Sequence, residues 1–255
     1  MVFPLYDDNT GRHITPYVNY ALIALNIFVF VVLQGIGTNE QFTYAFSTVP
    51  LEIVTGRDIV TASRVVVHPA TGQEFLIPGL AETPVSVYLT LLTSMFMHGG
   101  IAHLGGNMLF LWIFGDNIED RLGHIRYLGF YLICGLFASL AHVFTTYGLA
   151  GQEANMLVPS LGASGAISGV LGGYLLLHHS RRVTVFLFRF LTEVPAWVAI
   201  GIWFAFQLIS GLGMLGGGSQ QGGVAYAAHI GGFVAGLVLI KFFDIGRGRV
   251  TSNPY

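Results

Sequence analysis

The sequence predicts an all-α, polytopic membrane protein in which six helices cross the bilayer. Hydrophobic residues make up 53% of the 255 residues and charged residues only 9%, against roughly 25% charged residues in an average soluble domain. A chain this apolar lacks the polar surface to face water on all sides, so lipid is its main solvent. Apart from Arg57 and Arg64, which lie in a long loop that counts less, Lys and Arg residues also fall in alternate loops, which independently indicates six crossings.

Six apolar stretches approach the length of about 20 residues that a transmembrane helix needs. They span residues 17–33, 100–114, 127–147, 164–177, 194–213 and 224–243, and the fourth is short. Residues 1–16 are a predicted cytoplasmic segment, residues 17–243 the membrane domain and residues 244–255 a cytoplasmic tail. Residues 38–88 form a long external loop without an assigned structure, and the glycine-rich residues 211–223 are predicted to be mobile.

The distribution of positive charge predicts the orientation, because loops near helix ends carry excess Lys and Arg on the cytoplasmic side. The residues that set it are Arg12, Arg121, Arg126, Arg181, Arg182, Arg189, Lys241, Arg247 and Arg249. Both termini are therefore predicted to be cytoplasmic. Residues 1–16 do not resemble a signal or transit peptide, which favours the plasma (inner) membrane of a prokaryote.

Composition also limits the classes of partner that are expected. The net charge of −2 and the absence of a basic cluster argue against nucleic acid. The single cysteine, Cys134, cannot form an internal disulfide. No cofactor motif is present. The predicted partners are the lipid bilayer and other membrane proteins.

Four polar side chains lie in or beside apolar stretches, where polar groups are costly and are functional candidates by default: His103, Asn107, Ser164 and His229. Ser164 belongs to the small tetrapeptide at residues 162–165, at the start of the fourth stretch. The unpaired N–H groups of a helix start could stabilise a developing oxyanion there. The alternative for Ser164 is a helix cap or small-residue packing, since serine is ordinary in membrane helices.

His229 shares a helical face with Gly232 and Gly236, and residues 165–172 offer a matching small face on the fourth stretch. Two small faces permit close packing of helices, which would bring His229 to Ser164. A neutral imidazole beside a serine hydroxyl is the general-base arrangement of nucleophilic catalysis. The alternative for His229 is a structural hydrogen bond between helices.

His103 and Asn107 are four residues apart on the second stretch, so they face one way, and both can donate to an anionic oxygen. Their alternatives are a hydrogen bond between helices or, for the histidine, a metal site. No His-Glu-x-x-His motif is present and no carboxylate lies in the apolar part of a stretch, which argues against a metal. The same absence favours a Ser–His dyad over a triad, and argues against a protease with paired aspartates.

Together these residues resemble the rhomboid family of intramembrane serine proteases. The family carries Gly-x-Ser-Gly on its fourth helix, Ala-His-x-Gly-Gly-x-x-x-Gly on its sixth and His-x-x-x-x-His-x-x-x-Asn on its second, followed by Gly-x-x-x-Glu-x-Arg-x-Gly. The matching positions are residues 162–165, 228–236, 98–107 and 115–123. Order, spacing and helix placement all agree, so the resemblance predicts a six-helix rhomboid-like bundle that cleaves membrane-protein substrates with a Ser–His dyad.

The resemblance implies a role for each matching residue. Ser164 would be the nucleophile and His229 the general base. His103, Asn107 and the segment at Gly162 would form the oxyanion and substrate-binding site. The structural residues would be His98, which fixes the loop before the second helix, and Glu119 and Arg121, which pair and cap at its cytoplasmic end.

Two departures from the family pattern are present. Many relatives carry Tyr four residues after the serine, beneath the histidine, whereas this sequence has Ser168, so another group must support His229. The Trp-Arg pair of the first external loop is absent near Leu89 and Thr90. The alternative function is a catalytically inactive, rhomboid-like protein that binds membrane segments without cutting them. A small transporter would need paired charges or broken helices in repeated halves, and neither is seen.

Overall fold

The computed structural model describes residues 2–67, 72, 74–148, 153–187, 190–215 and 226–246. Its α-helices are α1 (Tyr17–Phe28), α2 (Glu40–Ala45), α3 (Pro50–Thr55), α4 (Thr90–Thr93), α5 (Ile101–Leu122), α6 (His124–Gly148), α7 (Ser164–Leu177), α8 (Ala196–Leu215) and α9 (Tyr226–Phe243). A π-helical turn, Val29–Leu33, prolongs α1. The strands are β1 (Val2–Asp7), β2 (Arg64–Val67), β3 (Glu74–Ile77), β4 (Arg182–Leu187) and β5 (Phe190–Pro195).

A helix lies on each of the six predicted apolar stretches, but fewer than six of them qualify as full spans in the described part of the chain. By length and composition α6 and α9 can each cross a membrane, and a third span results if Val87–Phe96 and Ile101–Leu122, bent by 80°, count as one. The remaining apolar helical segments, Tyr17–Leu33, Ser164–Leu177 and Ala196–Gly211, have at most 17 residues. At 14 residues, α7 is about 21 Å long, less than the ~30 Å of the hydrocarbon core.

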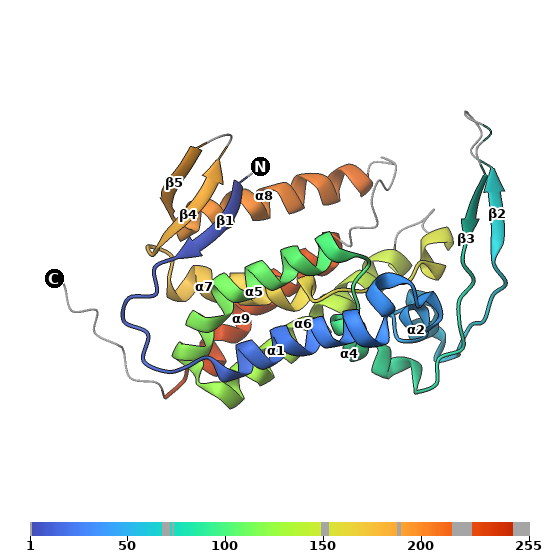
Figure 1. Ribbon diagram of the computed structural model, residues 1–255, viewed down its shortest axis with the longest axis horizontal. Helices are drawn as coiled ribbons and strands as arrows, with labels where there is room; N and C mark the ends of the chain where they lie inside the picture. The colour runs from blue at the N-terminus through green and yellow to red at the C-terminus, as the bar shows by residue number, and fades with distance from the viewer. Residues whose placement is uncertain are drawn as a thin grey trace.

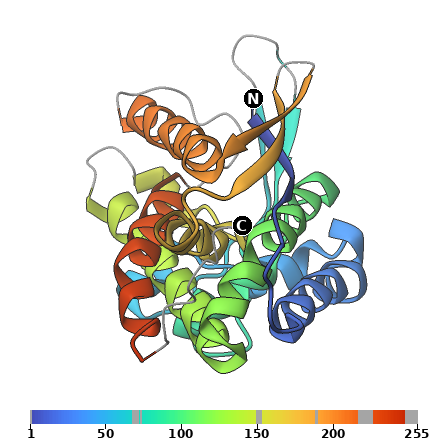
Figure 2. The ribbon, with the colours of Figure 1, turned by 90° about the vertical axis from the view of Figure 1, so that its left-hand side faces the viewer.

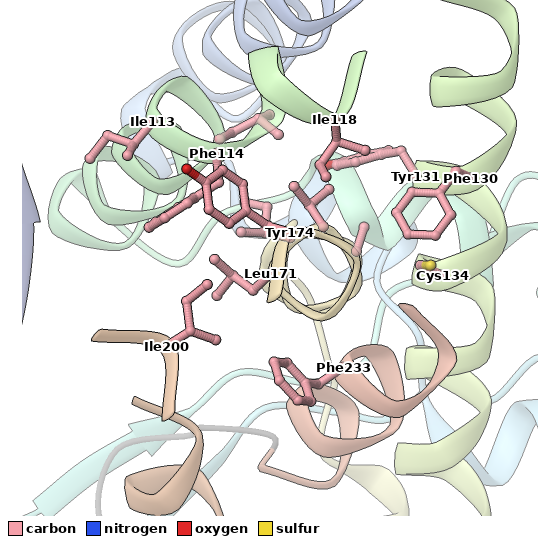
Figure 3. Close-up of a cluster of buried hydrophobic side chains, with 14 of the residues drawn as sticks. Ile113, Phe114, Ile118, Phe130, Tyr131, Cys134, Leu171, Tyr174, Ile200 and Phe233 are labelled. Carbon is pink, nitrogen blue, oxygen red and sulfur yellow. The ribbon is translucent and has the colours of Figure 1, made fainter. Parts of the chain in front are cut away.

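The helix α7 forms the centre of the bundle. It packs against α5, α6, α8 and α9, and Figure 2 shows it end-on among them. Its Leu171 and Tyr174 point into a core that also receives Phe130 from α6, Phe233 from α9 and Ile200 from α8 (Figure 3). Because its sides are covered by protein, α7 can be short and still end inside the molecule.

Glycines let α7 and α9 approach backbone to backbone. A Cβ at Gly232 would collide with the carbonyl oxygen of Gly165, and one at Gly236 would collide with that of Gly169. A Cβ at Gly172 would in turn collide with the carbonyl oxygen of Phe233. The close packing predicted from the two small faces is therefore present, and it fixes the distance between the two helices that carry Ser164 and His229.

The outer faces of the helices expose large apolar side chains. Examples are Phe28 at 51% exposure, Phe144 at 63%, Ile209 at 70% and Phe242 at 64%, from four different helices. Water-soluble monomers rarely expose contiguous apolar surface on this scale. Lipid is the solvent that such faces fit.

The N-terminal segment is more ordered than a plain cytoplasmic extension. β1 pairs with β4, and β4 with β5, in an antiparallel sheet of order β1-β4-β5, with Asp7 opposite Val183. The basic loop after α7 is thus part of a hairpin. The predicted external loop forms a second hairpin, β2–β3, and Figure 1 shows the two sheets at opposite ends of the molecule.

Candidate active site

Ser164 and His229 meet between α7 and α9. Ser164 is the first residue of α7, and its Oγ lies 2.7 Å from Nε2 of His229 on the first turn of α9. Both side chains are half-buried. At this distance a hydroxyl can donate to a neutral imidazole, and the helix start adds free backbone N–H groups beside the serine.

Gly162 shapes the approach to the serine. Its φ of +125° lies in the region that favours glycine, and a Cβ there would lie 2.9 Å from the ring of His103. Its N–H donates to the carbonyl oxygen of Ser94, which anchors the loop before α7. A side chain at Gly162 would therefore both strain the backbone and displace His103.

His103 and Asn107 lie on one face of α5 and line the same cavity as Ser164 and His229. Nδ1 of His103 accepts a hydrogen bond of 3.3 Å from the N–H of Gly99, so this nitrogen is held by the loop before α5. The side-chain nitrogen of Asn107 is buried and makes no hydrogen bond to the described residues. Burying an amide donor without a hydrogen-bond partner is costly, so this nitrogen is a candidate donor to an oxygen of a bound ligand.

The cavity has a volume of about 880 Å³ and is lined by both apolar and polar groups. Its walls come from α5, α6, α7, α8, α9 and the segments before α5 and α7. Among the described residues, no group of three or more His, Cys, Asp or Glu side chains is arranged to hold a metal. Residues 216–223 of the predicted mobile loop lie outside the described residues, as do residues 149–152 between α6 and α7.

Gln207 is a polar residue of the site that the sequence analysis missed. Its Oε1 lies 2.7 Å from Nδ1 of His229, and the residue is only 6% exposed. The signal was available, because an amide within the apolar stretch of α8 is as costly in lipid as the four side chains that were singled out. Ser168 takes no part in supporting His229, because its Oγ donates at 2.6 Å to the carbonyl oxygen of Ser164.

Comparison with known families decides what this site belongs to. Residues 86–244, more than half of the chain, match the Rhomboid domain. The chain belongs to the rhomboid family. This confirms the resemblance drawn from the four motifs, and it establishes an integral membrane protein.

Individual relatives are similar over different parts of this rhomboid. Rhomboid protein 1, mitochondrial, of Saccharomyces cerevisiae is 32% identical over 159 residues, 62% of this chain and 43% of its own length. Rhomboid protease GluP of Bacillus subtilis is 31% identical over 225 residues, 87% of this chain and 34% of its own length. RHOMBOID-like protein 4 of Arabidopsis thaliana is 35% identical over 150 residues, 58% of this chain and 32% of its own length. The chain thus spans less than half the length of these relatives.

The relatives do not support the predicted prokaryotic plasma membrane. Several carry "mitochondrial" in their names, including those from Saccharomyces cerevisiae and Danio rerio, while GluP is bacterial. The prediction relied on residues 1–16, which do not resemble a signal or transit peptide. That feature does not identify the membrane, because related domains occur both in proteins named as mitochondrial and in a bacterial protein.

His98 lies where a role in fixing the loop before α5 is feasible. Its backbone N–H donates to Oε1 of Gln34 at 2.9 Å, and its carbonyl accepts from Nε2 of the same amide at 3.0 Å. The buried ring stands edge-on to His103, with 5.2 Å between centroids. Gln34, at the end of the first predicted span, therefore connects that span to the loop before α5. The same loop places the ring of His98 beside His103.

Glu119 and Arg121 have partners that the sequence did not predict. The buried carboxylate of Glu119 accepts from the N–H groups of Val18 and Asn19 at 2.9 and 2.6 Å, so it caps the start of α1. Arg121 forms a bidentate pair with Asp244, with distances of 2.6 and 2.8 Å. Both residues join separate helices at one end of the bundle.

Proposed function

We propose that this rhomboid is an intramembrane serine endopeptidase that hydrolyses peptide bonds in or near transmembrane segments of other membrane proteins. The observation that carries the proposal is the 2.7 Å contact between Oγ of Ser164 and Nε2 of His229 inside a cavity of the membrane domain. Similarity to Rhomboid protease GluP over 87% of the chain supports the proposal.

Ser164 is the proposed nucleophile and His229 the general base. The hydroxyl attacks the scissile carbonyl carbon while Nε2 of His229 takes its proton, and the protonated ring then gives that proton to the leaving amine. The resulting acyl-enzyme is hydrolysed by a water that His229 activates in turn. The neutral dyad suits the site, because a permanent charge at membrane depth would be costly.

Asn107, His103 and the backbone N–H of Ser164 are the proposed oxyanion donors. The amide nitrogen of Asn107 has no hydrogen-bond partner among the described residues, so no existing hydrogen bond has to break when charge develops on the substrate oxygen. His103 lies over Gly162, next to the serine, and would donate through the nitrogen that Gly99 does not hold.

The cavity supplies what hydrolysis in a bilayer requires, which is room for water and for an extended backbone. A helical segment hides its carbonyl groups, so a substrate has to unwind locally to reach Ser164. Segments with Gly or helix-breaking residues near the external interface unwind most readily. Together with segments that carry small Ala or Ser residues there, they are the proposed substrates. In the proposed topology six helices cross the bilayer with both termini cytoplasmic. In it, α1, α7 and α8 pack against neighbouring helices.

The test is cleavage of a single-span membrane protein in liposomes by wild type, Ser164→Ala and His229→Ala. Wild type should cut, and both variants should lose at least about a thousandfold in rate. Trp112→Phe, on the exposed face of α5, serves as a control that should cut at the wild-type rate. A Ser164→Ala protein that still cuts would assign cleavage to another nucleophile or to a contaminant.

A fluorophosphonate probe separates the protease from an inactive, segment-binding rhomboid. The probe should label wild type at Ser164 and leave Ser164→Ala and His229→Ala unlabelled. A wild-type protein that binds a membrane segment but neither cuts it nor reacts with the probe would establish the binding function instead.

A further inference from the structure

His229 makes a second polar contact at the site, on the side away from the serine. Its Nε2 faces Oγ of Ser164 and its Nδ1 faces Oε1 of Gln207, each at 2.7 Å. The two contacts use both ring nitrogens, so together they fix the position and the orientation of the imidazole ring.

The nature of the acceptor decides which nitrogen carries the proton. A neutral imidazole has one N–H, and the other nitrogen is an acceptor. A base for Ser164 needs its lone pair on Nε2, so the proton must lie on Nδ1. The carbonyl oxygen of an amide accepts and cannot donate, and therefore it favours this tautomer.

Gln207 comes to this position through the packing of α8. The helix buries one face, which includes Ala196, Ala199, Ile200 and Gln207, while Phe206 and Ile209 stay at least half exposed. Stacking of Phe204 on Phe233, with 4.1 Å between ring centroids, holds α8 against α9 next to the contact. A buried amide on an apolar helix is stable there only with a hydrogen-bond partner, and His229 is the partner that the structure provides.

We propose that Gln207 is a positioning residue for the proposed hydrolysis, because it holds His229 in the orientation and tautomer that can take the proton of Ser164. The inference rests on the proposed function. It extends the machinery from a dyad on α7 and α9 to three helices, with an uncharged amide in the place that an acidic residue takes in a Ser–His–Asp triad. It also identifies the support for His229 that Ser168 does not give.

The decisive variants are Gln207→Leu, which removes the acceptor at similar volume, and Gln207→Glu, which keeps an acceptor and adds charge. Phe206→Leu, an exposed neighbour on α8, is the matched control. Gln207→Leu should lower kcat by about tenfold or more with little change in KM, because the ring turns and changes tautomer while the substrate site stays intact. Phe206→Leu should leave both constants unchanged.

Gln207→Glu supplies a readout that a merely structural residue would not move. A carboxylate beside Nδ1 favours the protonated ring, so the acid limb of the profile of kcat/KM against pH should move to higher pH. Activity above that limb should recover relative to Gln207→Leu. The other titratable groups whose charge reaches His229 are His103 on α5 and His142 on α6, and both stay in place in these variants.

Failure of the inference and failure of the proposed function give different results. Wild type that cuts only with Ser164 and His229 present, but is insensitive to Gln207→Leu, would overturn the role of Gln207 alone. An unchanged pH profile in an active Gln207→Glu protein would overturn it as well. Wild type that neither cuts nor reacts with the fluorophosphonate would overturn the proposed function. Should Gln207→Leu fail to fold, the Gln207→Glu profile still decides.

Discussion

At the scale of single residues, the site depends on atoms whose partners are set by neighbouring backbone. Gly162 can hold its φ of +125° and leave room for His103 only because it has no side chain. The hydroxyl of Ser168 donates to the carbonyl oxygen of Ser164. The buried amide nitrogen of Asn107 has no partner within the part of the chain that the structure describes. These conformations and hydrogen-bond partners depend on atomic positions at the scale of a few ångströms, and the residue types alone do not determine them.

Replacing Asn107 with alanine tests the free donor. The variant should fold normally, because no hydrogen bond within the described residues is lost from the amide nitrogen, and the cost of burying it disappears. Its kcat for the test substrate should fall by roughly 100- to 1,000-fold, as expected when an oxyanion donor is removed. Steady-state kinetics in detergent and a melting curve measure the two effects. Equal loss of folded protein and of activity would instead make Asn107 a structural residue.

At the scale of elements, the glycine contacts between α7 and α9 are the feature that brings nucleophile and base together. The main-chain oxygens of Gly165 and Gly169 occupy the places where side chains of Gly232 and Gly236 would stand. Side-chain packing at ordinary helix separations would move His229 away from Ser164. The helix α8 contacts α9 through aromatic stacking and through the hydrogen bond of Gln207 with His229.

Gly236→Ala should therefore lower both stability and activity. The added methyl meets the carbonyl of Gly169, so the helices have to separate, at a cost of about 1–3 kcal/mol typical of overpacking. Gly201→Ala on α8 is the matched control, because its Cβ would meet nothing within 4 Å. Thermal unfolding in detergent and probe labelling of Ser164 should show a loss for Gly236→Ala only. Equal melting temperatures for the two variants would argue against close packing of α7 and α9.

At the scale of the whole molecule, polar contacts at one end join the N-terminal segment to two helices, α5 and α7. Tyr174 of α7 and Asn117 of α5 both donate to Oδ2 of Asp7 at 2.7 Å. Arg12 pairs with Asp116 at 2.9 Å on the same side. The N-terminal segment is thus part of the fold and not an appendage.

This end should make the stability depend on pH. Burial raises the pKa of Asp7 from 3.8 to about 7, with the charge of Asp116 adding to the rise and Tyr174 and Arg181 opposing it. Since the folded pKa exceeds the unfolded one, the unfolded chain releases this proton first, and stability falls as pH rises from about 4 to about 7. Melting temperatures at pH 5 and pH 8 measure the loss. Asp7→Asn should remove this part of the difference, and an unaltered pH dependence in that variant would disprove it.

The two ends should face opposite sides of the membrane. The substitutions Thr10→Cys, near the N-terminal sheet, and Glu74→Cys, in β3, each place a cysteine at an exposed position. The native Cys134 is buried and should give little background. An impermeant maleimide added to sealed vesicles should label one of the two introduced cysteines from outside and the other only after permeabilisation. Labelling of both from one side would refute the proposed topology.

The sequence by itself determined the solvent, the family and most of the candidate chemistry, because hydropathy, charge placement and four short motifs are local properties. Polar residues within apolar stretches pointed to Ser164, His229, His103 and Asn107 without any coordinates. Only the tertiary structure decided which groups meet: Gln207 with His229, Glu119 with the start of α1, and β1 with β4. These pairs join residues 22 to 185 positions apart, and the packing of whole elements, which no short motif encodes, sets their distances.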